Sequence, residues 1–543
     1  MLVGVILLAG CDFNPSVVPA PTVTPTTGIP TATSVPPTPA PTEPPTAAAT
    51  ETEVPTVVPV VPTDTAVAPS TPTPSGPAAS VGTATPESGI RAASCEGMST
   101  GTGDGIGDEL YPKLGNPGYD TSHYTLDLLA DVATGSISGT TTIEARSLRD
   151  LPNFNLDFLG PQISTLTVDG KPAKFNRDQH ELRITPSAAL PNGATFKVVV
   201  AYKGLPNQSF SEDPAILLGW IHYDKGVYVA SEPVGAAQWY PVNDHPCDKA
   251  AYSIYITARK PYVVAANGVL DKTVDNGDTR TFRWEARQPV ASYLVTVNIA
   301  QFDVDTSKGP GGIAIRSFFP KSLNQSARAS LRKASSMIEY FNTIFGPYAF
   351  DAYGEVVADK DLPFALETQT LSLFGREFGS NGGFAEEAIV HELAHQWFGD
   401  SVSLEGWKDI WLNEGFATYA SYLWFEHSQG RKVLDGRIRA DYQIVAQGNF
   451  PPPGNPPVSN LFNPAVYLRG SLTLHALRLR VGDDAFFSIL KTYATRYKYG
   501  NANTPEFIAL AEQISGQNLD DFFNGWLYSE KMPPIPEMGL GNP

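Results

Sequence analysis

The pattern His391-Glu-x-x-His395, followed by Glu414, constrains this chain more than any other stretch of its sequence. Two histidines four residues apart lie on one face of a helix, so both imidazoles can reach one metal ion. Glu414 comes after positions 396–413, which is enough chain for the first helix to end and a second to begin. Two imidazoles, one carboxylate and an open fourth position are typical of a catalytic zinc site. The sequence therefore predicts one Zn²⁺ per chain, held by His391, His395 and Glu414.

Glu392 lies between the two histidines and is the candidate general base, because in this motif its carboxylate faces the attacking water. The same motif also arises by chance on solvent-exposed helices. Apolar neighbours such as Ile389 and Leu393 instead predict a buried helix, where imidazoles and carboxylates are costly without a cation. Thr418, on the next helix, either hydrogen-bonds a ligand histidine or faces the core.

Charge excludes some classes of partner. The chain carries 56 acidic and 38 basic residues, which gives a formal net charge of −18. An acidic chain without a basic cluster argues against nucleic acid and against anionic membrane surfaces as partners.

Residues 1–11 indicate where the protein is located. A short apolar run from Val3 ends in Ala9-Gly10-Cys11, which resembles a bacterial lipoprotein signal in which Cys11 is lipidated. The basic residues that usually precede the run are missing, and the alternative is an apolar start with an ordinary cysteine. We expect an extracytoplasmic lipoprotein, at the cell surface or in the periplasm, that is anchored in a membrane by its lipid.

Residues 12–105 are rich in Pro and Thr and poor in large apolar side chains. Such a segment cannot bury enough surface to offset the entropy lost on ordering, so we expect a disordered, extended stalk. With Cys11 assigned to the lipid, Cys95 and Cys247 remain in an exported chain. They are the candidate pair for a disulfide that joins the start of the folded part to the first domain.

Two domains follow the stalk. Residues 106–305 contain alternating, strand-like runs separated by turns such as Asn276-Gly277, and they predict an all-β domain. Helical periodicity dominates residues 306–543, which predicts an α+β, mainly helical domain. Within it we expect one long helix over 323–345 and a strand over 364–371 ahead of the metal-binding helix.

The metal motif, together with the sequence Trp-Leu-Asn-Glu-Gly-Phe-Ala around Glu414, resembles the aminopeptidase N-like family of zinc metallopeptidases, the gluzincins. The resemblance extends from Gly107 to the C-terminus. It implies a saddle-like N-terminal β domain and a thermolysin-like catalytic domain. The sequence stops where the catalytic domain ends in the family, so we expect a short form without the C-terminal helical domain and with a more open cleft.

The resemblance also implies roles for residues outside the metal motif. A Phe-Ala-Leu-Glu-Thr stretch stands where the family has its exopeptidase motif. There Glu367 would bind the free α-amino group of a peptide, at the end of the pocket away from the zinc, and the backbone of Ala365 and Leu366 would pair with that peptide. Glu232 stands at the position of a second amine-binding glutamate. Tyr467 stands where a tyrosine stabilises the tetrahedral intermediate.

We therefore predict a zinc-dependent aminopeptidase that acts on peptides with a free N-terminus, with Glu392 and Tyr467 as catalytic residues. Binding the ammonium group would place the first peptide carbonyl beside the metal. Phe364 and Thr368 depart from the Gly and Asn of the family motif, which leaves open an endopeptidase or another hydrolase on the same fold. A non-catalytic, surface-binding lipoprotein is the remaining alternative, although a binding module has no need of a general base.

Overall fold

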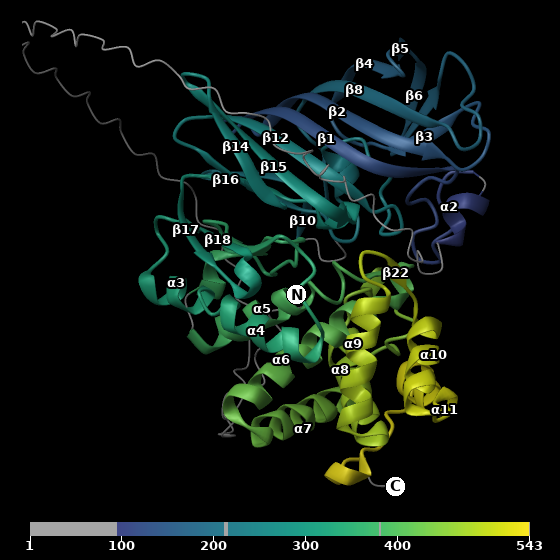
Figure 1. Cartoon of the computed structure of the whole chain (residues 1–543), viewed down its shortest axis with the longest axis vertical. Helices are drawn as coiled ribbons and strands as arrows, with labels where there is room; N and C mark the ends of the chain where they lie inside the picture. The colour runs from purple at the N-terminus through teal and green to yellow at the C-terminus, as the bar shows by residue number, and fades with distance from the viewer. Residues whose placement is uncertain (1–94, 102, 211–215, 380–381, 542–543) are drawn as a thin grey trace, which may run out of the picture. The chain divides into compact units, whose positions relative to one another are not determined.

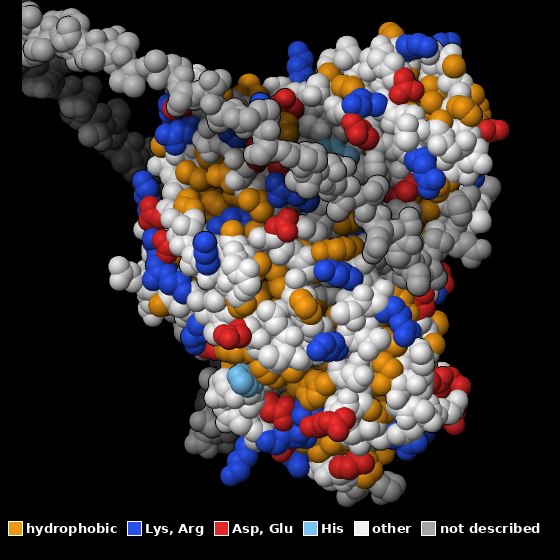
Figure 2. Space-filling view, in the orientation of Figure 1, with side chains coloured by type: hydrophobic (Ala, Val, Ile, Leu, Met, Phe, Trp, Pro, Cys, Tyr) orange, Lys and Arg blue, Asp and Glu red, His pale blue; other side chains and the backbone are white. Residues whose placement is uncertain are grey.

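The computed structural model describes residues 95–101, 103–210, 216–379 and 382–541 (Figure 1). The predicted signal with Cys11 and the predicted stalk up to residue 94 lie outside these ranges. Within the described ranges, no helix combines the length and apolar character that a bilayer crossing requires. On the face shown in Figure 2, Lys and Arg side chains are interspersed with Asp and Glu.

The folded part includes Cys95, so it begins earlier than the predicted domain boundary at residue 106. Cys95 and Cys247 form a disulfide in which the two Cα atoms are 5.7 Å apart. Helix α2 (Glu96–Thr100) follows the first cysteine, and its Met98 is buried beside the disulfide. Local composition could not reveal this boundary, because the segment that starts at Cys95 is held by a disulfide to Cys247, 152 positions away in the sequence.

The N-terminal region is built from strands, as the alternating sequence predicts. Its largest sheet has the order β14-β15-β12-β1-β2-β8-β4-β5, and the pair β1 and β12 is parallel. Along β1, Leu126 and Leu128 are buried while Asp127 between them is exposed, which is the period of two that a half-buried strand requires. The strands are β1 (Tyr119–Asp131), β2 (Ser136–Ser147), β4 (Gln162–Val168), β5 (Lys171–Pro172), β8 (Thr195–Gly204), β12 (Ala250–Arg259), β14 (Val269–Asp275) and β15 (Thr279–Val290).

Two smaller sheets complete this region and share its apolar core. The five-stranded sheet has the order β13-β16-β11-β10-β9, and the three-stranded sheet has the order β3-β7-β6. Their strands are β3 (Phe154–Asp157), β6 (Lys174–Asp178), β7 (Glu181–Thr185), β9 (Gln208–Phe210), β10 (Leu217–Tyr223), β11 (Gly226–Ala230), β13 (Val263–Ala266) and β16 (Val297–Ala300).

The C-terminal region begins with a four-stranded sheet and continues as helices, coloured green to yellow in Figure 1. Its strands are β17 (Phe302–Lys308), β18 (Ala314–Pro320), β19 (Ala352–Val357) and β20 (Ser372–Phe374), with the short pair β21 (Ser403–Leu404) and β22 (Asn501–Ala502). Its helices are α3 (Gln325–Leu331), α4 (Ala334–Ile344), α5 (Gly382–Ala394), α6 (Trp411–Gln429), α7 (Arg431–Gln447), α8 (Pro464–Val481), α9 (Asp483–Arg496), α10 (Thr504–Ser515) and α11 (Asp520–Phe523).

Two predicted elements differ from the structure. The helix expected over 323–345 is interrupted at Arg332-Lys333, where the Lys333 N–H bonds the carbonyl three residues before it, at Ser330. Leu331 and Ala334 on either side are both buried, so the apolar pattern continues across the interruption and hides it. The strand expected over 364–371 is reduced to a single bridge, and the strand itself forms later, as β20.

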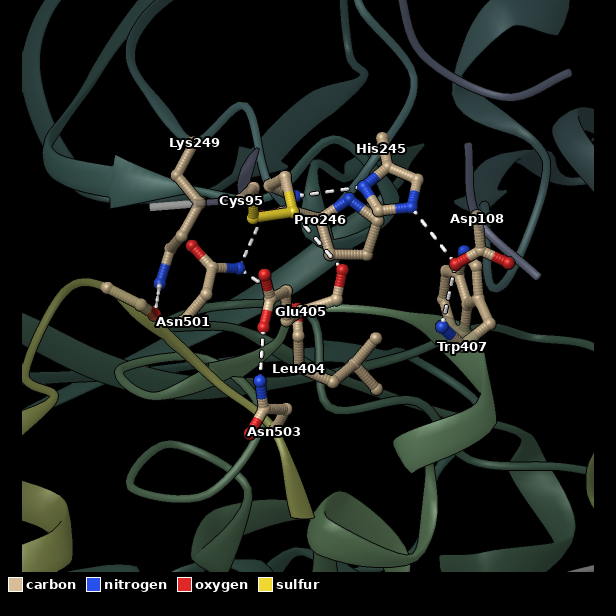
Figure 3. Close-up of a disulfide and its surroundings, with 12 residues drawn as sticks. Cys95, Asp108, His245, Pro246, Lys249, Leu404, Glu405, Trp407, Asn501 and Asn503 are labelled. Carbon is tan, nitrogen blue, oxygen red and sulfur yellow. Dashed lines mark hydrogen bonds and ion pairs between the residues drawn. A yellow bond between two sulfur atoms is a disulfide. The ribbon is translucent and has the colours of Figure 1, made fainter. Parts of the chain in front are cut away.

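The disulfide lies where the β region meets the catalytic region (Figure 3). Close to it, Lys249 donates hydrogen bonds to the carbonyl oxygens of Asp400 at 2.7 Å and Ser401 at 3.1 Å. Asp108 accepts a hydrogen bond from the Trp407 backbone N–H at 2.9 Å. The β region thereby fixes the segment that leads from the metal-binding helix α5 to α6.

Candidate metal centre and active site

The metal-binding histidines lie at the end of α5. His391 is in the last turn of this helix, and His395 follows it with its backbone N–H bonded to the His391 carbonyl at 3.2 Å. Glu414 lies in the first turn of α6. The Nε2 atoms of the two histidines are 3.1 Å apart, and Glu414 Oε2 is 3.2 Å from His391 Nε2 and 3.5 Å from His395 Nε2.

These separations fit a single zinc ion. Ligand atoms at 2.0–2.1 Å from a tetrahedral centre are about 3.3–3.4 Å from one another. The three observed separations lie between 3.1 and 3.5 Å. The structure therefore brings the three predicted ligands together in an arrangement that matches Zn²⁺.

The charge around the ligands also favours a cation. Burial lowers the pKa of His395, but the nearby carboxylates of Glu367 and Glu414 outweigh it and raise this pKa to about 10. Burial raises the pKa of Glu414, but the two histidines outweigh it and lower this pKa to about 2. A site that favours the protonated imidazole stabilises positive charge. The same carboxylates would therefore stabilise a divalent cation, which carries a larger positive charge than the proton.

His395 is oriented for metal binding by its other ring nitrogen. Its Nδ1 lies 3.0 Å from the Phe398 carbonyl oxygen, which makes Nδ1 the donor and leaves Nε2 for the ion. Gly399 allows this turn, because its φ is +131° and a Cβ atom there would lie 3.2 Å from His395 Nδ1. Thr418, the other predicted partner, is buried, and its hydroxyl has no hydrogen-bond partner among the described residues. Thr418 therefore faces the core.

Glu392 and Glu367 lie side by side next to the ligands. One carboxylate oxygen of each lies within 4.8 Å of the other and of a His395 ring nitrogen. Burial raises the pKa of both carboxyls, and His395 opposes the shift. We expected the amine-binding Glu367 away from the metal, and the structure instead places it beside the proposed base. Covalent geometry explains why: the α-nitrogen and carbonyl carbon of a peptide's first residue are only about 2.5 Å apart.

Comparison with known proteins identifies the family. A family model described as the peptidase family M1 domain matches residues 329–526, which include all three metal ligands. The model of the peptidase M1 N-terminal domain matches residues 120–294. The chain belongs to peptidase family M1.

Solved structures of this family share the fold. An M1 zinc metallopeptidase from Deinococcus radiodurans, bound to a Tyr-Ser-Ala substrate, superposes with a TM-score of 0.74 at 28% identity. The match covers 80% of this chain and 100% of that chain. A structure described as a two-domain M1 zinc metallopeptidase bound to L-arginine matches with the same TM-score and identity, over 80% of this chain and 99% of that one.

Curated relatives are longer than this chain. Aminopeptidase M1 of Arabidopsis thaliana is 23% identical over 79% of this chain and 52% of its own length. Probable aminopeptidase 1 of Saccharolobus solfataricus is 25% identical over 72% of this chain and 51% of its own length. Glutamyl aminopeptidase of Bos taurus is 26% identical over 54% of this chain and 33% of its own length. The chain thus spans about half the length of these relatives, or less.

The M1 peptidase places Tyr467 against the metal cluster by close helix packing. Tyr467 lies on α8, and its ring stacks on that of His391 with centroids 6.1 Å apart. Helices α6 and α8 touch at Gly415 and Gly470, where a Cβ atom on Gly470 would lie 2.8 Å from the Gly415 Cα. Backbone cannot yield to such a contact, so glycine at both positions lets α8 bring Tyr467 close to Glu414 on α6.

The segment expected to pair with a peptide corrects one prediction. The Leu366 N–H and C=O both bond to Leu373, at 2.9 and 2.8 Å, so the Leu366 backbone is already paired within the protein. In an extended chain, alternate residues direct their backbone groups to opposite sides. The Ala365 backbone therefore remains a predicted contact for the peptide. The prediction for the Leu366 backbone was wrong.

Gln396 is a positioning residue that the sequence reasoning missed. Its Nε2 donates to the Glu367 carbonyl at 2.9 Å, and its Oε1 accepts the Thr370 N–H at 2.8 Å. The amide thus fixes the Glu367 segment to the end of α5, next to His395. The sequence did contain a clue to this role: Gln396 is a polar residue directly after the second histidine of the motif, in a segment predicted to be buried.

Glu232, just after β11, also reaches the cluster. Burial raises the pKa of its carboxyl well above the usual range, with further contributions from Glu367 and Glu414. Its Oε1 is buried and has no hydrogen-bond partner among the described residues. Tyr293 is close to the same carboxylates: burial raises the pKa of its hydroxyl, and Glu367 and Glu232 raise it further. The Tyr293 hydroxyl accepts a hydrogen bond from Asn413 at 3.3 Å. No sequence motif marked Tyr293.

Proposed function

We propose that this M1 family member is a zinc-dependent aminopeptidase that removes N-terminal residues from peptides with a free N-terminus. The observation that carries the proposal is the Glu367 carboxylate, which is buried, has Oε1 unpaired among the described residues and lies within 4.8 Å of Glu392. A buried carboxylate without a partner is costly, and the ammonium group of a peptide offsets this cost through charge-assisted hydrogen bonds.

The side chains divide the reaction between them. Zinc, when bound by His391, His395 and Glu414, supplies Lewis acidity toward water and toward the substrate carbonyl. Glu392 accepts a proton from the attacking water and delivers it to the leaving amine. The Tyr467 hydroxyl donates a hydrogen bond to the oxygen on which negative charge develops.

Substrate binding sets which bond is cleaved. Glu367 and Glu232 hold the ammonium group, and the Ala365 backbone aligns the chain that follows it. Because the ammonium site adjoins the base, only the first peptide bond reaches Glu392. The known relatives support this proposal: several are named aminopeptidases, and the structure of the Deinococcus enzyme contains a tripeptide substrate.

One matched pair of substrates tests the proposal against an endopeptidase. A peptide with a free N-terminus and the same peptide N-acetylated are incubated with the zinc-loaded protein, and products are followed by mass spectrometry. We expect stepwise loss of N-terminal residues from the free peptide only, and loss of this activity with a chelator. Internal cleavage of the acetylated peptide would show an endopeptidase instead.

We also propose that the protein is an extracytoplasmic, lipid-anchored lipoprotein. The support is the sequence Leu-Leu-Ala-Gly-Cys ending at Cys11 and the predicted extended stalk after it. Expression in a bacterial host with a labelled fatty acid should label the wild type and place it in the membrane fraction. The Cys11→Ser variant should be unlabelled, and an equally labelled variant would overturn the assignment.

A further inference from the structure

A second cluster of metal-ligating side chains lies in the β region, apart from the residues of the catalytic centre. Asp157 ends β3, Glu181 begins β7, and the two are direct partners in the antiparallel pairing of these strands. His180 occupies the turn that joins β6 to β7. One ligand atom from each of these three residues lies within 4.8 Å of the other two.

The two carboxylates of this cluster are buried and incompletely paired. Asp157 is 1% exposed and Glu181 is 3% exposed. Among the described residues, Asp157 Oδ1 and both carboxylate oxygens of Glu181 lack a hydrogen-bond partner. His180 Nε2 lies 3.3 Å from Glu181 Oε1. Unpaired carboxylate oxygens at this depth are costly and require a partner.

One imidazole cannot balance the negative charge at this position. Acidic side chains directly opposite each other on paired strands repel, and burial strengthens the repulsion. The folded β region thus concentrates more negative than positive charge at this point.

The groups are also held in orientations that suit a ligand. Asp157 Oδ2 accepts hydrogen bonds from the Asp244 backbone N–H at 2.8 Å and from the Asn116 amide at 3.3 Å. These bonds fix the carboxylate through Oδ2 and leave Oδ1 without a hydrogen-bond partner among the described residues. His180 Nε2 lies 3.0 Å from the Lys113 carbonyl oxygen, and an ion bound at Nε2 would replace the ring proton in this contact and have that oxygen as a neighbour. The bonds to Asp157 Oδ2 are the kind of outer contact that orients ligands in metal sites.

We propose that Asp157, His180 and Glu181 form a second divalent-cation site, selective for a transition metal such as Zn²⁺ or Mn²⁺. One imidazole with two carboxylates suits these ions, whereas Ca²⁺ and Mg²⁺ prefer oxygen ligands alone. The 3.3 Å between His180 Nε2 and Glu181 Oε1 matches the spacing of two ligands on one ion. The bound cation links β3 to the β6–β7 hairpin and removes the repulsion between Asp157 and Glu181.

Metal counting in a protein without the catalytic site tests this proposal. The full chain with His391→Ala and His395→Ala is stripped with a chelator, loaded with Zn²⁺, dialysed and measured for zinc per chain and for Tm. We expect one zinc to remain per chain and the Tm to rise on loading. Adding Glu181→Gln should raise the dissociation constant at least tenfold and abolish the Tm rise.

The controls separate metal binding from a general effect on folding. Glu285→Gln, in β15 of the same region, removes a carboxylate that already accepts hydrogen bonds from Ser253 and Tyr255, and it should leave the zinc count unchanged. Asp157→Asn is a second test of the site and should behave as Glu181→Gln does. The metal-free Tm and circular dichroism of each variant report whether it folds.

Three results would overturn the proposal. The first is no zinc retained by the variant without catalytic histidines. The second is equal retention when Glu181→Gln or Asp157→Asn is added to a protein that still folds. The third is tight binding of Ca²⁺ in place of Zn²⁺ and Mn²⁺, which would assign an all-oxygen site rather than one that uses His180.

Discussion

The two sides of the active site are built differently. The metal ligands, Glu392 and Tyr467 are carried by α5, α6 and α8 and the turn that follows α5, whereas Glu367 and Glu232 lie in irregular segments next to strands. Helices hold reacting groups rigidly through their own backbone bonds and their packing. The irregular side is fixed instead by side-chain contacts such as the one from Gln396. We infer that the helical side determines the rate of the reaction and the irregular side determines which peptide is bound.

The largest effect should come from the helical side. Glu392→Gln removes the proton acceptor but keeps its volume, so kcat should fall about 10³–10⁴-fold with zinc still bound. Steady-state kinetics and metal analysis measure both quantities. The control Glu339→Gln changes an exposed glutamate of α4 and should leave kcat unchanged. Substantial activity in Glu392→Gln would contradict the inference that the helical side determines the rate of the reaction.

Tyr467→Phe should have the next largest effect. Loss of one hydrogen bond to the developing oxyanion should lower kcat about 10²-fold with little change in KM. Tyr442→Phe is the matched control, because its hydroxyl bonds the Pro533 carbonyl at 2.9 Å in a different part of the helical region. A rise in KM without a fall in kcat would instead assign Tyr467 to substrate binding, the role proposed for Glu367 and Glu232.

Glu367→Gln should change selection more than rate. A charge-assisted hydrogen bond contributes about 1.5–3 kcal/mol, so kcat/KM for a peptide with a free N-terminus should fall about 10–100-fold. Any residual cleavage of an acetylated peptide should stay the same, because that peptide has no ammonium group for Glu367 to bind. Equal losses on both peptides would contradict the role in amine binding.

Glu232→Gln should reduce kcat/KM for free peptides by less, about 2–10-fold. In the proposed function Glu232 shares the ammonium group with Glu367, so either glutamate should partly compensate for the other. The double variant, measured beside both single variants, tests whether their effects are coupled. Strictly additive losses would mean that the two carboxylates do not act on one group.

Asp108 belongs to the contacts that join the β region to the segment between α5 and α6. A substitution there should lower the stability of the fold and leave the catalytic rate unchanged. Burial raises the pKa of Asp108, but hydrogen bonds from His245 and from backbone N–H groups, among them that of Trp407, outweigh this and lower it to about 2. A lowered carboxylate pKa stabilises the fold above the unfolded value and loses this contribution as the pH falls toward 2.

Asp108→Asn should therefore cost about 2 kcal/mol at pH 7, and the difference from wild type should shrink steadily between pH 4 and pH 2. Urea denaturation of both proteins at pH 7 and pH 3 measures this change. A cost that does not depend on pH would show that shape, and not charge, explains the contribution of Asp108.

The sequence was most informative where function depends on local spacing. The two metal-binding histidines belong to one helical turn, so the 3.6-residue period alone predicts that they meet. It was least informative across strands, since pairing joins residues such as Asp157 and Glu181 through turns that no short pattern specifies. The predicted strand over 364–371 failed for a related reason, because the chain turns at positions 369–370 and Leu366 forms a single bridge to Leu373, which belongs to β20.

The amino-acid sequence was enough to assign the class of this protein: an N-terminal β region, a mainly helical catalytic region, and a zinc site made of His391, His395 and Glu414. The folded structure was needed to show that Glu367 adjoins Glu392, that Leu366 is already paired, and that buried carboxylates lie close to His180. Periodicity and motifs report contacts along one element. Contacts between elements depend on packing, such as the approach of α6 to α8 at two glycines, which is fixed only when the whole chain folds.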